Sequence, residues 1–241
     1  MWVRKQLDTI VVPTPNIVPQ PTVVIADTTF WGRHYGVCVF RSCPLKKNIW
    51  WHEVAGELMA HYYYAKKILE TKGWSFIAAV VDGRRGLINV FKGIPVQMCQ
   101  FHQIKIVTRY VTTRPKTDAG KELLALVLTL TETDEAIFTV ALAAWHTKWE
   151  SFINEKTVST FISGKTTWYY THKGVRSAYR SLKTNLPYLF TYQKYPELNM
   201  PNTTNDLDGS FSNLKKKLSA HHGLRKDRRF KVISEILLGR A

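Results

Sequence analysis

The sequence predicts an α/β fold in which helices flank a mixed sheet and a helical segment interrupts the alternation before the last helix. Three observations point to this fold. Short strand-like runs come first, a strand–helix–strand unit follows, and a long stretch with helical periodicity comes next. The chain has 241 residues, 45% of them hydrophobic, which is enough to bury one substantial core. We therefore expect one core with an insertion.

Residues 1–21 end in a proline-rich stretch, PTPNIVPQP. Proline cannot continue a helix or lie in a central strand, so an extended tail or linker is expected. Three β-branched or aromatic runs follow, TVVIADTTF, YGVCVFRS and NIWWHEVA, separated by Gly, Pro, Lys and Asn. This pattern predicts an antiparallel meander.

A helix is predicted over residues 56–73, where Gly73 stands at the expected C-cap and four apolar residues recur at spacings of four, three and four: Leu58, Tyr62, Ala65 and Leu69. The continuous apolar runs SFIAAVVDG and IPVQMCQF predict strands covered on both faces. A short helix between them makes the two strands parallel.

From about residue 118 to residue 195 the pattern becomes helical, with KELLALVLTL and DEAIFTVALAAWHTKWESFI followed by a polar and aromatic stretch. We expect an all-helical insertion there. After PELNMPNTTN, within residues 196–241, a last helix is predicted from an apolar stripe at i, i+4, i+7 and i+11: Leu207, Phe211, Leu214 and Leu218.

The charge balance favours a polyanionic partner. Thirty-four Lys and Arg stand against 18 Asp and Glu, a formal net charge of +16, and the pI is near 9.8. A membrane-spanning helix is not expected, because the longest apolar runs are far shorter than about 20 residues. The three cysteines form no CxxC pair, which excludes a disulfide framework and a four-cysteine zinc site and fits a reducing cytoplasm.

Two aspartates lie at or near the ends of predicted central strands. Asp27 sits inside the apolar run VVIAD, and Asp82 ends FIAAVVD. An ionised carboxylate there is costly unless a cation or hydrogen-bond donors compensate it, and open α/β sheets place their sites at strand ends. The alternative is structural, with Asp82 forming a turn before Gly83 and Asp27 a strand-edge charge.

A third acid is found at the start of the last helix, in TTNDLDGSFSNLKKK. Asp208 falls in the first turn beside the apolar stripe, so its carboxylate can face the sheet, and Ser212 and Lys215 continue the same face. A capping acid that complements the helix dipole is the structural alternative, and Asp206 could serve instead. Three carboxylates suit Mg²⁺ or Mn²⁺, and two such ions can support in-line phosphodiester displacement.

Four motifs in order resemble the Mutator-like transposases and their bacterial insertion-sequence relatives: ADTTF, VVDGRRGL, VQMCQFHQIK and PNTTNDLDGSFSNLKKKL. The resemblance spans about residues 22–241. It implies a ribonuclease H-like fold, with core segments at 22–117 and 196–241 and an all-helical insertion at 118–195. It also implies a three-acid site in which Asp27 and Asp82 match the first two catalytic aspartates. Asp208 stands at the position usually held by glutamate.

The resemblance extends to Cys99 and His102, which match the CxxH signature of such transposases. Two ligands are too few for a structural zinc, so a buried thiol beside a satisfied histidine and a supporting role near the site both remain open. Several such transposases stack an insertion-domain tryptophan on an extruded base. Trp145, Trp149 and Trp168 are candidates, although the first two, at i and i+4, are more typical of a helix core.

The chain from Gly209 to Ala241 has a local excess of seven positive charges, and its position beside the third acid favours DNA binding over a solvated face. Its cations are Lys215, Lys216, Lys217, Arg225, Lys226, Arg228, Arg229, Lys231 and Arg240. The SGKT sequence beginning at Ser163 is no phosphate loop, because Ser159 stands where the first glycine is required.

These observations lead to the hypothesis of a DNA transposase catalytic core. It would cleave a DNA strand with water and two Mg²⁺ or Mn²⁺ ions, and the freed 3′-hydroxyl would then attack target DNA. A ribonuclease H-like nuclease without strand transfer and a non-catalytic DNA-binding remnant are the alternatives. The family implies element ends and target DNA as partners, a homodimer or larger assembly on DNA, and a cytoplasmic, nucleoid-associated location in a bacterium.

The resemblance also implies an N-terminal DNA-binding domain, for which about 20 residues are too few. We expect the proline-rich linker to be the joint to such a domain. The chain as given would then bind DNA mainly through phosphates and without reading particular element ends.

Overall fold

The computed structural model of the chain describes residues 7–84, 86–160, 165–221 and 223–239. Its centre is a five-stranded sheet in the order β3-β2-β1-β4-β5. β2 pairs antiparallel with β1 and β3, whereas β4 pairs parallel with β1 and β5. The strands are β1 (Pro21–Phe30), β2 (Gly36–Ser42), β3 (Lys47–Val54), β4 (Ser75–Val81) and β5 (Val96–Met98). This order with one reversed strand is the ribonuclease H-like arrangement, so the predicted fold class is confirmed.

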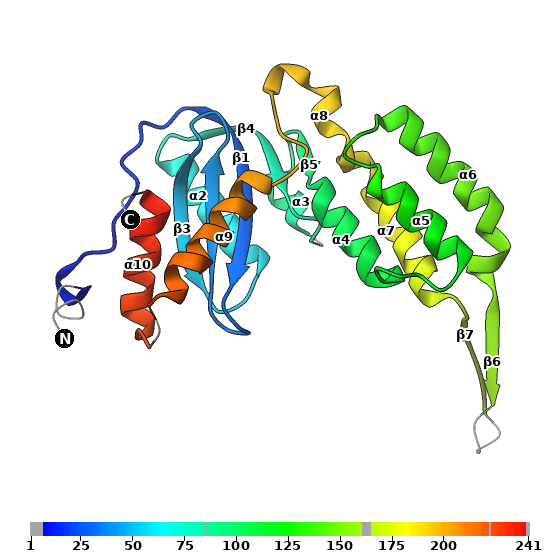
Figure 1. Ribbon diagram of the computed structural model, residues 1–241. Coiled ribbons are helices and arrows are strands. Elements are labelled where there is room, and N and C mark those ends of the chain that lie inside the picture. Colours follow the sequence, from blue (N-terminus) through cyan, green and yellow to red (C-terminus); the bar gives the residue numbers. More distant parts are fainter. Residues whose placement is uncertain (1–6, 85, 161–164, 222, 240–241) are drawn as a thin grey trace.

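Helices cover both faces of the sheet (Figure 1). On one face α2 (Met59–Thr71) and the short α3 (Leu87–Val90) pack against Val24 and Ala26 of β1. On the other face α9 (Asn205–Ser219) and α10 (Lys226–Leu238) pack against Val23 and Ile25. Successive strand residues point to opposite faces, so β1 supplies a core to each side. The apolar stripe predicted for α9 is the face that this helix buries. In α2 the predicted Tyr62, Ala65 and Leu69 are buried, whereas Leu58 is the N-cap residue and is 59% exposed.

A second core lies beside the sheet and is built from α4 (Gln100–Val111), α5 (Asp118–Leu128), α6 (Glu135–Asn154) and α7 (Lys173–Leu189) (Figure 1). Two helix starts follow capping rules. The side chain of Thr117 accepts a hydrogen bond from the Gly120 N–H at 3.2 Å. Asp134 accepts one from the Ile137 N–H at 2.8 Å. The chain then returns to the sheet through α8 (Thr191–Lys194) and a 3₁₀ turn (Pro196–Leu198).

Two buried glutamines join the helical unit to the edge of the sheet. The amide of Gln97 donates to the carbonyl oxygen of Leu189 at 2.9 Å and accepts from the Tyr192 N–H at 3.0 Å. Gln100 also donates to Leu189, at 2.9 Å. Both glutamine side chains are fully buried, and buried polar groups are costly unless they are paired. These bonds therefore fix the end of α7 against β5 and the start of α4.

The helical segment also contains a hairpin, which corrects the expectation of an all-helical insertion. β6 (Lys156–Thr160) and β7 (Thr166–Tyr170) pair antiparallel and project away from the helices (Figure 1). The physical reason is composition, because the sequences KTVST and TTWYY consist largely of β-branched and aromatic residues that favour strands. The domain boundaries at residues 21, 117 and 195 stay predictions.

The run IPVQMCQF divides between two elements, which also differs from the sequence expectation. β5 holds only Val96–Met98, and α4 starts at Gln100. The reason is the helical spacing of the buried side chains that follow: Gln100, Gln103, Val107 and Val111. His102 therefore lies in the first turn of a helix, at the edge of the sheet.

Residues 10–20 form neither helix nor strand, as expected for a proline-rich linker. The described start of the chain is docked on α10, where Asp8 binds Arg228 through two hydrogen bonds of 2.7 Å. Residues 1–6 of the predicted tail, Ser163 and Gly164 of the SGKT sequence, and Arg240 of the basic segment lie outside the described residues. Within the described part of the chain, no helix has the length and apolar character to cross a membrane.

Candidate metal centre

The parallel pairing of β1 and β4 brings the first two predicted aspartates together. In the register of these strands Ala26 lies opposite Val81, so the next residues, Asp27 and Asp82, meet at the same edge. β4 ends at Val81, which leaves Asp82 in the following turn, where its carboxylate accepts the Arg84 N–H at 3.0 Å. Asp27 lies within β1 and is only 5% exposed.

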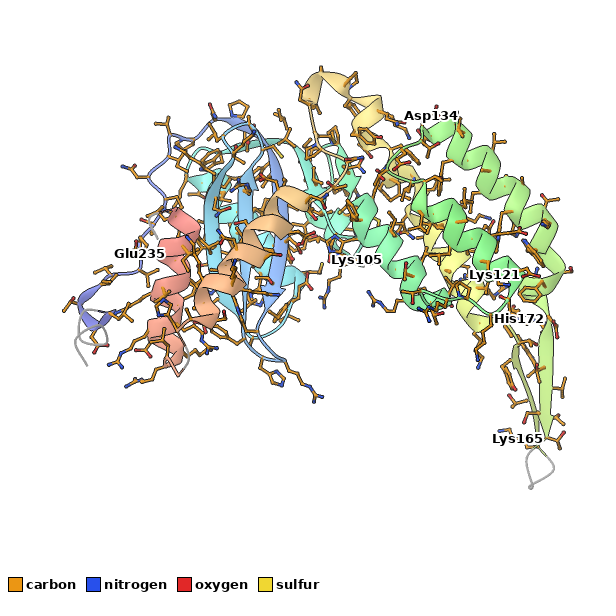
Figure 2. The ribbon with its side chains drawn as sticks, in the orientation of Figure 1. Lys105, Lys121, Asp134, Lys165, His172 and Glu235 are labelled. Carbon is orange, nitrogen blue, oxygen red and sulfur yellow. The ribbon has the colours of Figure 1, made fainter. Side chains whose placement is uncertain are left out.

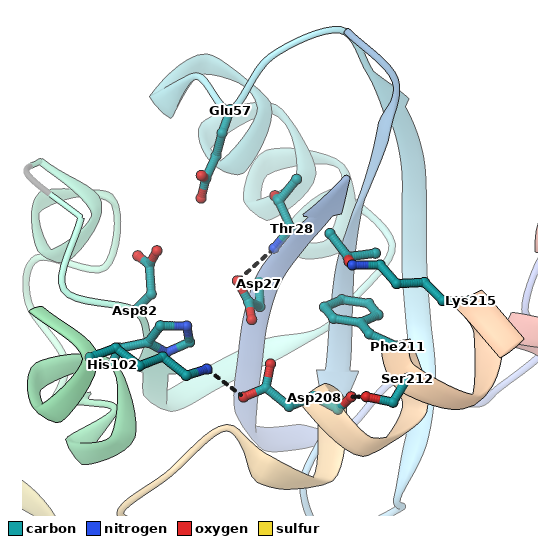
Figure 3. Close-up of a pocket in the computed structure, with 11 residues that line it drawn as sticks. Asp27, Thr28, Glu57, Asp82, His102, Asp208, Phe211, Ser212 and Lys215 are labelled. Carbon is teal, nitrogen blue, oxygen red and sulfur yellow. Dashed lines mark hydrogen bonds and ion pairs between the residues drawn. The ribbon is translucent and has the colours of Figure 1, made fainter. Parts of the chain in front are cut away.

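Asp208 reaches the same place from α9. Asp27 alternates with Val23 and Ile25 along β1, so all three side chains face the side of the sheet that α9 covers. The stripe that begins at Leu207 holds α9 against that face, and the adjacent Asp208 points toward Asp27 (Figure 3). The alternative third acid, Asp206, turns elsewhere and binds the Arg41 guanidinium at 2.7 Å.

Four acids and one histidine form two groups of possible metal ligands, and Asp27 belongs to both. Ligand atoms of Asp27, Glu57 and Asp82 lie within 4.8 Å of one another, and so do those of Asp27, His102 and Asp208. All five side chains line one cavity of about 420 Å³ (Figure 3). The three predicted aspartates thus converge, and Asp27 belongs to both groups.

Glu57 is the acid that sequence reasoning missed. It lies in the loop between β3 and α2, and its side chain is 13% exposed. One carboxylate oxygen accepts the Tyr62 hydroxyl at 2.8 Å, and the other pairs with Arg84. Tyr62 also shares a hydrogen bond of 2.8 Å with Thr28, the residue after Asp27. No motif marks Glu57, and the sequence prediction placed it inside the helix of residues 56–73. In the structure it precedes α2, in a strand-to-helix loop where sites of α/β sheets gather.

Burial and mutual repulsion make the ionised carboxylates of this cluster unfavourable without a cation. Burial raises the pKa of Asp27 to about 7, and the nearby Asp82 carboxylate adds to the rise while His102 opposes it. Burial, followed by Asp82, also raises the pKa of Glu57. A cation placed between these groups would remove both the repulsion and the cost of desolvation.

His102 and Cys99 occupy neighbouring positions with different roles. Burial lowers the pKa of His102, but Cys99 and then the carboxylates of Asp27 and Asp82 outweigh it and raise that pKa to about 9. The Nδ1 atom of His102 is buried and has no hydrogen-bond partner among the described residues. Cys99 does not line the cavity. Its sulfur accepts the N–H and the hydroxyl of Thr204, each at 3.3 Å.

The Cys99 contacts connect α4 with the start of α9. Thr204 is the N-cap residue of α9, and its carbonyl accepts the N–H of Asp208 at 3.0 Å. Gln100 strengthens the connection, because its N–H donates to the Asn202 carbonyl at 3.0 Å and its side chain accepts from Asn202 at 2.9 Å. The CxxH pair therefore places one possible ligand, His102, and supports the turn that carries another.

The donor set fits Mg²⁺ or Mn²⁺. Four carboxylates supply the oxygen ligands that these hard cations prefer, and His102 adds a nitrogen ligand that Mn²⁺ accepts readily. The raised pKa of Asp27 and the orphaned Nδ1 of His102 are what a metal-free cation site would show.

Of the predicted DNA-binding cations, one lines the cavity and the others lie elsewhere on α9 and on or just before α10. Lys215 lines the cavity together with Ser212, as the sequence spacing indicated. On α10, by contrast, Lys226 pairs with Glu53 at 2.8 Å and Arg228 pairs with Asp8. The remaining described cations lie on α9, just before α10 and on α10, and do not line the cavity: Lys216, Lys217, Arg225, Arg229 and Lys231.

Two of the three candidate tryptophans lie in the helical unit, and the third lies on the hairpin. Trp145 is buried in the core of the helical unit and donates to the Ala119 carbonyl at 3.1 Å. Trp149 is half-buried, packs against the same core and donates to Glu122 at 2.8 Å. Trp168 lies on the hairpin with 54% of its surface exposed, and the Lys156 ammonium stands 4.1 Å from the centre of its ring. None of the three lines the acidic cavity.

Comparison with known proteins gives solved structures that resemble this chain only at low similarity. No family model and no curated protein matches the chain. Among solved structures, the large terminase nuclease from the thermophilic phage G20c is 12% identical, with 67% of this chain and 82% of that chain covered and a TM-score of 0.23. The same nuclease with bound magnesium is 14% identical, with 73% and 94% covered and a TM-score of 0.24. The fold assignment therefore rests on the strand order described above.

Proposed function

We propose that this chain cleaves phosphodiester bonds of DNA at the Asp27 cluster, with two divalent metal ions. The observation that carries the proposal is the shared position of Asp27 between two groups of ligands. Two-metal phosphoryl-transfer sites hold their ions roughly 3.5–4 Å apart, and a carboxylate shared by both ligand groups can lie between them. Glu57 and Asp82 would hold one ion, and His102 and Asp208 would hold the other.

The bound ions would supply a nucleophilic oxygen and stabilise the leaving oxygen of an in-line displacement. The protein itself would position the metal ligands and the phosphate. Hydrogen bonds from Tyr62 and Thr28 hold the carboxylates of Glu57 and Asp27 in position. Lys105 and Lys215 line the same cavity, where they can bind the non-bridging oxygens of a phosphate and orient it.

The specific reaction we propose is that of a transposase, in which cleavage is followed by attack of the freed 3′-hydroxyl on a second DNA. The order of the four motifs supports this choice. Assembly on DNA as a homodimer or larger complex belongs to the same proposal, because two ends must be processed together. A nuclease that hydrolyses without joining remains the enzymatic alternative.

A cleavage and joining assay tests the proposal. Labelled duplexes with free 3′-hydroxyl ends are incubated with the protein, a supercoiled plasmid, and either Mn²⁺ or EDTA. We expect metal-dependent nicking and labelled joint products, and Asp82→Asn should lose both. Asp206→Asn is the matched control: Asp206 lies on the same helix turn as Asp208, but it pairs with Arg41 and does not line the cavity, so this variant should retain both activities.

The outcomes separate the alternatives. Nicking without joint products indicates a nuclease without strand transfer. DNA binding that ignores the metal, with no nicking at all, contradicts the proposal and indicates a non-catalytic DNA-binding remnant.

A further inference from the structure

A second cavity of about 1080 Å³ opens directly from the metal centre. α4 and α7 form one wall of it, and the turn after β4 with α3 forms the other. Four residues line both cavities: Glu57, Asp82, His102 and Lys105. Lys105 projects between the sheet and the helical unit (Figure 2). A chain-like ligand lying in this groove would thus pass the candidate ligands of the metal ions.

The groove is basic along its length. Lys105 and Arg109 lie one turn apart on α4, Arg180 faces them from α7, and Arg84 stands on the opposite wall. Arg84 pairs with Glu57, and Lys105 lies 4.0 Å from Asp208. Arg109 and Arg180 are exposed and, in the part of the chain that the structure describes, pair with no carboxylate. Both guanidinium groups are therefore available to a phosphate.

Between these cations α7 presents short polar side chains. Ser177, Ser181 and Thr184 recur at i, i+4 and i+7 on the groove side of the helix. Asn185 lies beside them and donates to the side chain of Gln103 at 2.8 Å, which holds α7 against α4. Hydroxyl and amide groups between arginines are the donors that contact a nucleic-acid backbone without reading its sequence.

Two tyrosines complete the lining. Tyr110 is 46% exposed at the end of α4, and Tyr188 is half-buried near the end of α7. An exposed aromatic ring within a basic groove, such as that of Tyr110, is typical of sites for unpaired strands, because every base can stack on it. A base-paired strand keeps its bases stacked on one another and cannot use this ring.

We propose that this groove binds an unpaired DNA strand that continues from the phosphate at the metal centre. The inference rests on the proposed function and adds the form of the substrate, a strand separated from its complement on one side of the scissile phosphate. Arg109 and Arg180 bind the backbone, and Tyr110 stacks on a base.

Binding measured in EDTA tests this inference separately from cleavage. Fluorescence anisotropy is recorded with a labelled single strand of about 12 nucleotides, long enough to fill a groove of this class, and with the matching duplex. Wild type is compared with the double variant Arg109→Gln, Arg180→Gln. The matched control, Lys67→Gln with Lys72→Gln, removes two charges from exposed positions at α2, on the opposite side of the sheet from α9.

We expect the arginine variant to bind the single strand at least tenfold more weakly, whereas the control binds as wild type does. The slope of log K against log salt should fall by about 1.4 for two lost phosphate contacts, at about 0.7 each for a single strand. Tyr110→Leu should lower the affinity about fivefold or more, and Tyr110→Phe, which keeps a ring for stacking, should bind as wild type does.

Equal affinities and salt slopes in wild type and the arginine variant would overturn the inference. A loss confined to the duplex would also overturn it and would make the groove a double-strand site. Failure of the proposed function looks different, because a protein that binds the single strand through these residues but never nicks DNA with Mn²⁺ retains the groove and lacks the reaction.

Discussion

Replacing Asp27 by asparagine should abolish cleavage and make the metal-free protein more stable. Asparagine has nearly the same shape, and its side-chain oxygen can still accept the Thr28 N–H that Asp27 accepts at 2.7 Å. It removes the charge shared by the two ligand groups. In the metal-free protein this charge is buried and repelled by the neighbouring carboxylates, so its removal should stabilise the metal-free fold.

The size of the effect follows from the pKa of Asp27, which rises from 3.8 to about 7 on folding. At about 1.36 kcal/mol for each pH unit, keeping the carboxylate ionised costs the fold up to about 4 kcal/mol above pH 7. The pKa of Asp27 is higher in the folded than in the unfolded protein, so protonation of its carboxylate stabilises the fold. This contribution is fully present below pH 3.8 and is lost as the pH rises to about 7.

The assay is thermal unfolding in EDTA at pH 5 and pH 8. We expect Asp27→Asn to unfold at a higher temperature than wild type at pH 8, by up to about 10 °C for a chain of this size, with a smaller gain at pH 5. Asp206→Asn is the control, because Asp206 is exposed, pairs with Arg41 and does not line the cavity. An Asp27→Asn protein that is less stable than wild type at pH 8, or that still cleaves DNA, would refute the reasoning.

Three further predictions concern the pH dependence of metal binding, the role of Glu57 and the role of Cys99. Mn²⁺ affinity, measured by titration calorimetry, should increase between pH 6 and 9 by up to about tenfold per pH unit for each proton released. The reason is that Asp27 and His102, with pKa values of about 7 and about 9, must lose protons to act as ligands. An affinity that does not change with pH would contradict this. Glu57→Gln should reduce the number of bound Mn²⁺ ions from two to one, and an unchanged stoichiometry would remove Glu57 from the site. Cys99→Ala should lower the free energy of unfolding in urea by about 1–3 kcal/mol, because the buried donors of Thr204 lose their acceptor, and it should weaken Mn²⁺ binding. Cys99→Ser, which keeps an acceptor, should restore both properties. Equal behaviour of the two variants would show that the side chain of Cys99 does not position the start of α9.

Local sequence patterns predicted those parts of the fold that depend on one face of one element. The spacing of Tyr62, Ala65 and Leu69 predicted the buried face of α2, and the unbroken apolar run before Asp82 predicted a strand covered on both faces. Gly73, with a φ of +95°, ends α2 in the left-handed conformation that glycine adopts without a steric penalty. In these cases the spacing of apolar residues, together with a residue that ends the element, is enough to predict a helix or strand.

Features that depend on tertiary contacts were harder to predict. The division of IPVQMCQF depends on buried glutamines whose partners, such as Leu189, lie about 90 residues away. The β6–β7 hairpin was hidden within a polar stretch beside strong helical patterns. Glu57 joins the site only because Tyr62 and Arg84 hold it there, and no spacing along the chain expresses that contact.

Metal positions in a crystal soaked with Mn²⁺ test the central claim most directly. The anomalous signal locates each ion independently of the protein model. We expect two peaks roughly 3.5–4 Å apart, both bound by Asp27, one contacting Glu57 and Asp82 and the other contacting His102 and Asp208. A single ion, ions bound only elsewhere, or an Asp208 side chain turned into solvent would contradict the account.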